Sequence, residues 1–251
     1  MPADERSFPS VWARPRRSQR DQPPLTRGQI VSQALALLDA EGIEALSMRQ
    51  LGARLNAGAT SLYTHVASKD ELMELAVDEV FGEVAVPGGS DPARWRAGAG
   101  RCAASIRSVI LRHPWIVTVL GEAGLVYLGP NMMRLFDGLL GLFETAGFAL
   151  AEANIAINTL VAYVIGTGVS EAAWLTTLAR NRQDERAWIE RWRPAAQAAA
   201  EAYPRLQRLY AMDRGKDPAA VRDADFAAGL ERVLDGLAAR LGGPGTAGAG
   251  T

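Results

Sequence analysis

The chain has 251 residues, of which 48% are hydrophobic and 22% are charged, and its formal net charge is −1. This composition is ordinary for a globular protein. The near-zero charge excludes a molecule whose whole surface binds nucleic acid, so any such surface must be local. The single cysteine, Cys102, excludes an intramolecular disulfide and a cysteine-rich metal site. No secretory-type apolar stretch opens the chain, and we expect a cytoplasmic protein.

The two ends of the chain have the composition of unstructured segments, rich in proline and polar residues at the start and in glycine at the end. The arginines from Arg14 to Arg20 form either an arm that enters the minor groove of DNA or a solvated tail. The expected organisation is a disordered arm over 1–24, a small unit over 25–85, a joint at 87–89, a larger unit over 90–241 and a flexible tail over 242–251.

Start and stop signals predict helices through the rest of the chain. Three Ser/Thr-x-x-Glu/Gln patterns, beginning at Thr26, Ser47 and Ser68, fit capping boxes, in which two side chains satisfy free backbone N–H groups reciprocally. The strand-like run WIVTVL, residues 115–120, has no partner strand, so we predict a helix there as well. The apolar run 155–169 is too short to span a bilayer and is interpreted as a buried helix. The other expected helices cover about 30–39, 48–55, 60–66, 69–84, 91–112, 130–147, 152–179, 185–200 and 222–241, and the fold class is all-α.

The stretch TSLYTHV, residues 60–66, carries Leu62 and Val66 on one helix face and hydrogen-bonding side chains on the others. A helix this short and outwardly polar buries little, so packing alone does not explain it. The preceding helix over 48–55, and a tight turn in which Gly58 is expected to take a positive φ, complete a helix-turn-helix. In this motif the second helix enters the major groove and presents small polar side chains to base edges.

At these residues the sequence resembles the tetracycline-repressor (TetR) family of transcriptional regulators. The segment GIEALSMRQLGARLNAGATSLYTHVASKDELMELAVDEV is close to the family pattern, most specifically in LYTHV and SKDEL. The segments LFDGLLGLFETAGF and AYVIGTGVSEAAW are similar to the regulatory domain of the subfamily that contains the tetracycline repressor. The resemblance implies DNA contacts at Arg49, Ala59, Thr60, Ser61, Tyr63, His65 and Lys69. For the polar and charged residues among them, the alternative is a solvated side chain or one that supports helix packing.

Three positions depart from the founding member of that family. Ala59 stands where that repressor reads a base with glutamine, so we expect a different operator. Ala85 and Val119 stand at the places of the histidines by which it holds a tetracycline–magnesium complex. The sequence therefore predicts an effector other than that complex, with no metal and no cofactor.

The larger unit is rich in aromatic side chains. Aromatic rings at helical spacing are usually core residues, but together with a few polar groups they can also enclose an apolar ligand pocket. The resemblance implies such a pocket. The candidate ligand-binding residues are Trp95, Trp115, Tyr127, Asn131, Phe136, Asn158, Glu171 and Trp174.

A stripe of small residues on the long helix, and an apolar face on the last helix, suggest helices that approach a partner closely. Packing within one chain is the alternative. The resemblance places a dimer interface on these two helices. Its candidate residues are Thr159, Ala162, Gly166, Ser170, Ala173, Phe226, Leu230, Val233 and Leu237.

We therefore expect a ligand-responsive DNA-binding regulator, a repressor released from its operator by a small apolar or aromatic molecule. The alternative is an all-helical small-molecule-binding protein or enzyme with an incidental helical hairpin. No enzyme constellation is apparent, because the cysteine has no adjacent base and the two histidines are far apart; His113, before a proline, is interpreted as a structural residue at a helix end. The expected partners are a partly palindromic double-stranded DNA operator, a small-molecule effector and a second copy of the chain, with no membrane.

Overall fold

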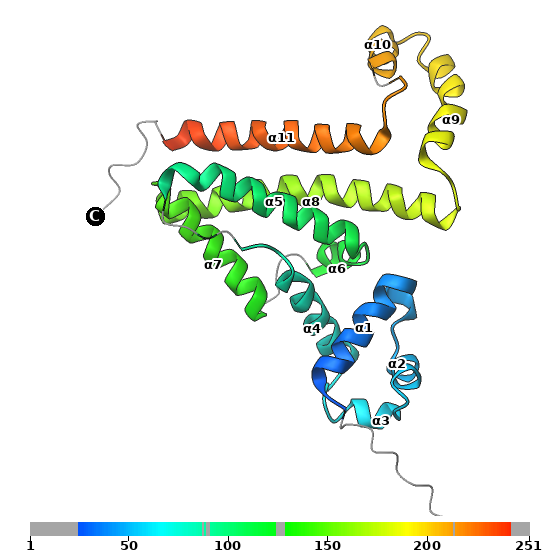
Figure 1. The fold of residues 1–251 in the computed structure, drawn as a ribbon, viewed down its shortest axis with the longest axis vertical. Helices are drawn as coiled ribbons and strands as arrows, with labels where there is room; N and C mark the ends of the chain where they lie inside the picture. The colour runs from blue at the N-terminus through cyan, green and yellow to red at the C-terminus, as the bar shows by residue number, and fades with distance from the viewer. Residues whose placement is uncertain (1–24, 87, 89–90, 124–128, 213, 242–251) are drawn as a thin grey trace, which may run out of the picture.

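The computed structural model describes residues 25–86, 88, 91–123, 129–212 and 214–241. All regular structure within these residues is helical, and the all-α prediction is confirmed (Figure 1). The strand-like run 115–120 contributes to a helix, as predicted. The helices are α1 (Arg27–Glu41), η2 (Ile43–Ala45), α2 (Met48–Arg54), α3 (Ala59–Leu62), α4 (Lys69–Gly82), η3 (Pro92–Arg94), α5 (Trp95–Arg112), α6 (Ile116–Ala123), α7 (Pro130–Thr145), α8 (Leu150–Arg180), α9 (Glu185–Ala199), α10 (Pro204–Met212) and α11 (Pro218–Leu241).

Three helix predictions need correction. The helix predicted over 60–66 ends at Leu62, and hydrogen-bonded turns carry the chain on to Val66. The last helix begins at Pro218 and not near residue 222. Helix α10 was not predicted. All its residues except Tyr210 are exposed, so it lacks the buried stripe that makes a helix visible in a sequence.

Only one of the three capping boxes is complete. At the start of α1 the Thr26 hydroxyl accepts from the Gln29 backbone, and the Gln29 side chain accepts from the Thr26 N–H in return. Ser47 caps α2, but the Gln50 side chain turns away to donate to Glu41 at 3.0 Å. The Ser68 hydroxyl caps α4 in the same way, at a distance of 3.0 Å from the Glu71 backbone nitrogen. The hydroxyl caps therefore mark the helix starts correctly, while the second half of the box depends on tertiary neighbours.

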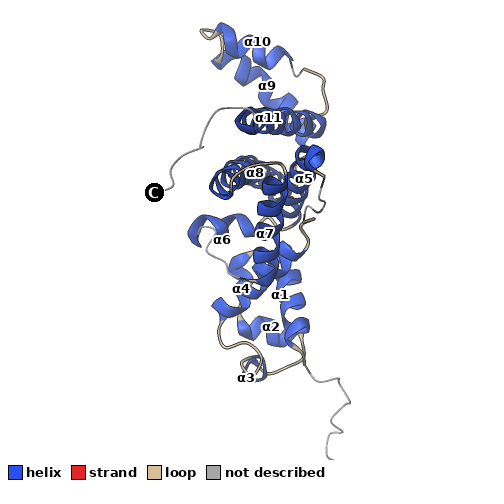
Figure 2. Ribbon diagram, turned by 90° about the vertical axis from the view of Figure 1, so that its left-hand side faces the viewer, coloured by secondary structure: helices blue, strands red, loops and turns tan. Residues whose placement is uncertain are grey.

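The apolar side chains of helices α1 to α4 are part of a hydrophobic core that continues into the larger unit. The side chains of Ile30, Leu37, Leu51, Leu62 and Leu72 are fully buried in it, with at least one contributed by each helix. Helix α1 packs on α2 and α4, and α2 packs on α3. Helices α1 to α3 therefore form the three-helix unit expected from the sequence. This unit lies at one end of the elongated molecule, with α3 outermost (Figures 1 and 2).

Helix α8 is the central helix of the larger unit and packs against α5, α7 and α11. Glycines permit two of these approaches. A Cβ on Gly168 would lie 3.2 Å from Ile110 of α5, and a Cβ on Gly229 of α11 would lie 2.2 Å from the hydroxyl of Tyr163. That hydroxyl donates to the Phe226 carbonyl at 2.8 Å, so a hydrogen bond joins α8 to α11 within the chain.

At 31 residues, α8 is longer than the apolar run that marked it in the sequence, so the length argument against a membrane span is wrong. Among the described residues it is the one helix long and apolar enough to cross a bilayer, a test that core helices of globular proteins also pass. Beyond α8, helices α9 and α10 form an arm at the end of the molecule opposite α3 (Figures 1 and 2).

Candidate DNA-binding surface and effector cavity

The turn between α2 and α3 is set by two residues. Asn56 takes the positive φ, at 50°, whereas Gly58 has φ −69°, so the sequence assigned the strained position to the wrong residue. Asparagine tolerates this left-handed region better than most residues. Gly52 of α2 lies so close to the turn that a Cβ there would be 2.8 Å from the Ala57 carbonyl oxygen. The angle between α2 and α3 therefore requires a residue without a side chain at position 52.

The polar face of α3 points away from the core. Leu62 and Val66 are 0% and 1% exposed, while Tyr63 between them is 51% exposed. Thr60 and Ser61 are also exposed, and Ala59 and His65 are half-buried. A helix held by two apolar anchors and presenting hydroxyls outward is suited to reading base edges.

Two cations flank this face. Arg49 lies on the first turn of α2 and Lys69 is the first residue of α4, and both are exposed. At the same helix start, a hydrogen bond from the Ala67 backbone and the Arg27 guanidinium, outweighing some burial, keep the pKa of Glu71 below its usual value. Glu71 is thus bound by groups of the protein, while Lys69 and Asp70 are the exposed charges at the α4 N-terminus.

Helix α4 is joined to α7 by one carboxylate. Asp78 accepts from the backbone N–H groups of Asn131 and Met132, at 3.0 and 3.1 Å, and so caps the start of α7 from a different helix. The Asn131 amide returns a bond to the Asp78 carbonyl at 3.1 Å. Gly129 makes room for this contact, because a Cβ there would lie 2.2 Å from the carboxylate.

A second polar junction joins α1 and the end of α4 to the end of α5 and the start of α6. The His113 ring is buried, with Nδ1 2.7 Å from Asp39 of α1 and Nε2 3.3 Å from Glu83. The indole of Trp115 donates to the same Asp39 oxygen at 2.7 Å. His113 also ends α5, where its backbone N–H bonds the Val109 carbonyl, so it is a residue of the helix end and of the junction.

A small apolar cavity, here called the effector cavity, lies among α4, α5, α6, α7 and α8. Its volume is about 20 Å³, roughly the space of one water molecule. Every side chain around it is hydrophobic. They are Phe81, Val84, Ile106, Val109, Ile110, Ile116, Leu120, Met132, Leu135, Phe136, Leu139, Val161 and Ile165.

The structure does not gather the eight candidate ligand residues around one cavity. Only Phe136 lines the effector cavity. Trp95 packs in the core against Phe143 and Phe148, with both ring-centroid distances at 5.7 Å. Trp115 and Asn131 belong to the two junctions described above. Asn158 is exposed, Trp174 lines a different pocket, and Tyr127 lies outside the described residues.

The remaining candidate, Glu171, is the centre of an ion-pair network. Its carboxylate accepts from Arg107 of α5 at 2.7 and 2.8 Å and from Arg222 of α11 at 3.1 Å. Burial favours a higher pKa for Glu171, but the bonds from Arg107 and Arg222 outweigh it and hold the pKa below the usual value. The charged form is thus committed to joining three helices and is not displayed to a ligand.

The dimer candidates divide into two groups. Phe226, Leu230 and Leu237 are buried inside the chain and Val233 is half-buried, so for α11 the alternative of packing within one chain holds. The α8 stripe differs, because all of its members are exposed. They are Thr159, Ala162, Gly166, Ser170 and Ala173.

The two units match two family models. Residues 30–76 match the model of bacterial regulatory proteins of the tetR family, and residues 88–241 match the tetracycline repressor-like C-terminal domain. The chain belongs to the TetR family of transcriptional regulators. The family resemblance drawn from LYTHV and SKDEL is thereby confirmed.

Relatives of this TetR-family chain cover nearly its whole length. An HTH-type transcriptional regulator of Saccharopolyspora erythraea is 36% identical over 93% of each chain. The transcriptional repressor DrrR1 of Streptomyces coeruleorubidus is 32% identical over 92% of this chain and 84% of its own. The TetR-family protein ActR of Streptomyces coelicolor, solved with actinorhodin, is 31% identical, covers 88% of this chain and 100% of its own, and has a TM-score of 0.70.

The two positions that the family resemblance equates with the metal-holding histidines of the tetracycline repressor carry side chains without ligand atoms. Ala85 is exposed and Val119 is buried. Within the part of the chain that the structure describes, no group of three His, Cys, Asp or Glu side chains is placed to hold a metal ion.

Gly52→Ala should weaken DNA binding. The added methyl would meet the Ala57 carbonyl at 2.8 Å, so the turn must shift and α3 must change its angle. We expect affinity to fall about tenfold for a DNA fragment selected with the wild-type protein, measured by fluorescence anisotropy. Gly28→Ala is the control, because a Cβ there meets nothing within 4 Å. Equal affinities for the two variants would contradict the role of Gly52.

Proposed function

We propose that this TetR-family protein is a repressor that binds a partly palindromic operator as a homodimer, on the bacterial nucleoid in the cytoplasm. The observation that carries the proposal is α3, where Leu62 and Val66 anchor a helix whose hydroxyls and Tyr63 face outward. Repression is supported by the relative DrrR1, which is named a transcriptional repressor. Arg49 and Lys69 would bind phosphates on either side of the base-reading residues Ala59, Thr60, Ser61 and His65.

The proposed effector is a mainly apolar, ring-bearing molecule that enters the effector cavity. The hydrophobic lining supports this class, and the relative ActR was solved with actinorhodin. A cavity of about 20 Å³ is far smaller than the roughly 300 Å³ of small ligand pockets, so the walls must separate on binding. Phe81 and Val84 at the end of α4 are part of those walls. Effector binding would therefore displace the helix that connects the cavity to α3.

Release of DNA requires that the effector bind the released state much more tightly than the DNA-competent state. To change the DNA-competent population from 99:1 to 1:99, the effector must favour the released state by about 10⁴-fold, near 5.5 kcal/mol. Two sites in a dimer divide this into about 2.7 kcal/mol each. Burial of one or two rings supplies that amount.

The proposed dimer uses the exposed face of α8. Its stripe from Thr159 to Ala173 is made of small residues, which permit close helix approach, and α11 adds the exposed Ala224, Ala227 and Ala228. The apolar residues of α11 named earlier are not part of this proposal, because they pack inside the chain.

Tyr63→Ala and Lys69→Ala should each weaken operator binding while leaving helicity unchanged, because both side chains are exposed. Lys69→Ala should also lower the salt slope of the binding constant by about one unit, since one fewer counterion is released. Arg191→Ala, an exposed arginine on α9, serves as the control and should change neither quantity. Wild-type affinity in both test variants, titrated at several salt concentrations, would refute the assignment of α3.

Gly166→Trp should dissociate the dimer and reduce DNA affinity with it. Gly166 is exposed and a Cβ there has no neighbour within 4 Å, so we expect the added bulk to act on a partner. Gly141→Trp, at an equally open glycine on α7, is the matched control and should remain dimeric. Sedimentation velocity decides, and a dimeric Gly166→Trp protein would place the interface elsewhere.

Release of DNA should not require magnesium. A screen of aromatic compounds against the protein–DNA complex, run with and without a chelator, should give the same active compounds in both arms. The reason is that the effector cavity offers hydrophobic side chains alone. Release that occurs only with a metal-chelated compound would restore a tetracycline-like mechanism.

A further inference from the structure

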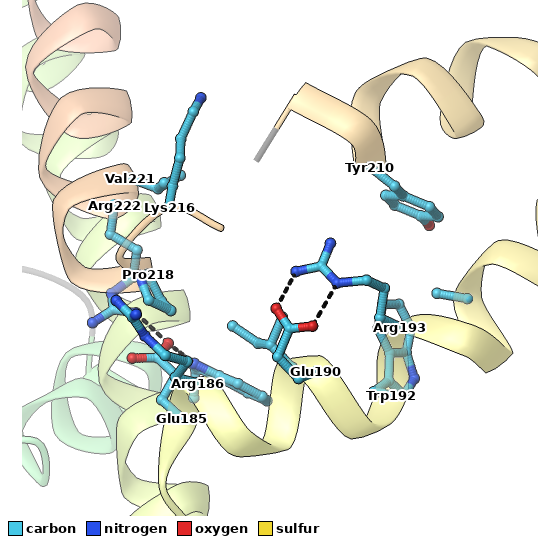
Figure 3. Close-up of a pocket in the computed structure, with 13 residues that line it drawn as sticks. Glu185, Arg186, Glu190, Trp192, Arg193, Tyr210, Lys216, Pro218, Val221 and Arg222 are labelled. Atoms are coloured by element: carbon cyan, nitrogen blue, oxygen red, sulfur yellow. Dashed lines mark hydrogen bonds and ion pairs between the residues drawn. The ribbon is translucent and has the colours of Figure 1, made fainter. Parts of the chain in front are cut away.

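A larger pocket lies at the end of the molecule opposite α3, between α9, α10, the end of α8 and the start of α11 (Figure 3). We call it the outer pocket. Its volume is about 290 Å³, close to the lower limit of small-molecule sites. None of its lining residues belongs to the effector cavity, so the two are separate sites.

Three aromatic rings, Trp174, Trp192 and Tyr210, line the outer pocket, and Trp188, which does not line it, contacts both tryptophans. Trp174 meets Trp188 edge to face, with ring centroids 4.7 Å apart. Trp188 and Trp192 are stacked at 5.9 Å with 14° between their planes, and Trp192 continues to Tyr210 at 6.2 Å. Trp192 is nevertheless 47% exposed. An indole that is rigidly supported by its neighbours and open on the pocket side offers a flat surface to a planar ligand.

The charged groups around the outer pocket are mostly paired. The two carboxylates of the lining are already bound: Glu190 by Arg193 at 2.8 and 3.1 Å, and Glu185 by Arg222 and by the Trp174 N–H at 2.6 Å. Four cations line the pocket, and two further carboxylates contact them from outside the lining: Asp217 lies 3.5 Å from Arg186, and Glu171 accepts from Arg222 at 3.1 Å. The cations are Arg186, Arg193, Lys216 and Arg222 (Figure 3).

We propose that the outer pocket binds a planar aromatic molecule bearing a negatively charged group. Its rings would lie against Trp192, and its anionic group would face Arg186. Arg186 is suited to this role because its ion pair with Asp217 is long, at 3.5 Å, and its side chain is 61% exposed, so an anionic ligand can replace the carboxylate. The effector cavity has no polar side chain to stabilise an anion, so the outer pocket is the better site for a charged ligand.

The test uses the full-length protein and the fluorescent probe anilinonaphthalene sulfonate, an aromatic anion. The neutral analogue phenylnaphthylamine has the same rings without the sulfonate. We expect the anion to bind about tenfold more tightly than the analogue. Trp192→Ala should raise the dissociation constant of the anion about tenfold by removing the stacking surface. Arg186→Gln should raise it about threefold, and added salt should reduce that difference.

The controls are Tyr203→Ala and Arg191→Gln, an exposed aromatic and an exposed arginine close in sequence that do not line the pocket. Both should keep wild-type affinity. Because Arg186 is exposed, Arg186→Gln tests the charge even if the tryptophan variant loses structure. Equal affinity in test and control variants, or equal affinity for the anion and its neutral analogue, would overturn the proposal. Either result leaves the operator and effector proposals standing, because the outer pocket shares no residue with those sites.

Discussion

The hydrogen bonds accepted by the Asp78 carboxylate join the two units, and the proposed coupling between effector and DNA depends on them. It caps the first turn of α7 from α4, a helix whose other end carries Lys69 beside the proposed DNA-reading surface. A cap of this type, supplied by another helix of the same chain, satisfies backbone N–H groups that would otherwise be free at the helix start, and it is favoured by the positive end of the helix dipole. Because these hydrogen bonds join α4 to α7, a movement of either helix changes the contact between the two units.

The second junction strengthens this arrangement. Asp39 of α1 accepts from Trp115 at the start of α6 and lies 2.7 Å from His113, so α1, which packs on α2 and α4, is also held by the larger unit. Both junctions border the effector cavity, because residues of α6 and α7 supply part of its lining. A nearly filled cavity between two fastened helices cannot accept a ligand without moving them. In the proposed mechanism, ligand binding in this cavity and movement of α4 are then one event, with a free energy shared between the two sites.

The features predicted from the sequence were those set by local patterns. Serine and threonine caps located the starts of α1, α2 and α4, and the apolar pair Leu62 and Val66 located the buried side of α3. The family resemblance rested on the same continuous segment. The all-α class and the helix at 115–120 followed because no second strand was available to pair with it.

The features that failed depend on partners distant in sequence. Asn131 looked like a ligand residue because its partner, Asp78, is 53 residues away, and Glu171 did so because Arg107 is 64 residues away. The apolar stripe of α11 could not be assigned to the chain or to a second copy without knowing that Phe226 packs on Tyr163. Asp78 itself was missed, and no short pattern marks a residue that caps another helix.

The coupling through Asp78 can be measured directly by hydrogen exchange at the amides of Asn131 and Met132, with and without operator DNA. Coupling is reciprocal, so DNA bound at α3 must affect the junction between α4 and α7 just as the effector does. The account predicts that DNA slows exchange of these two amides in the wild-type protein. In Asp78→Ala the amides should exchange quickly, with no response to DNA. The same DNA-dependent protection in Asp78→Ala, or no response in the wild-type protein, would contradict it.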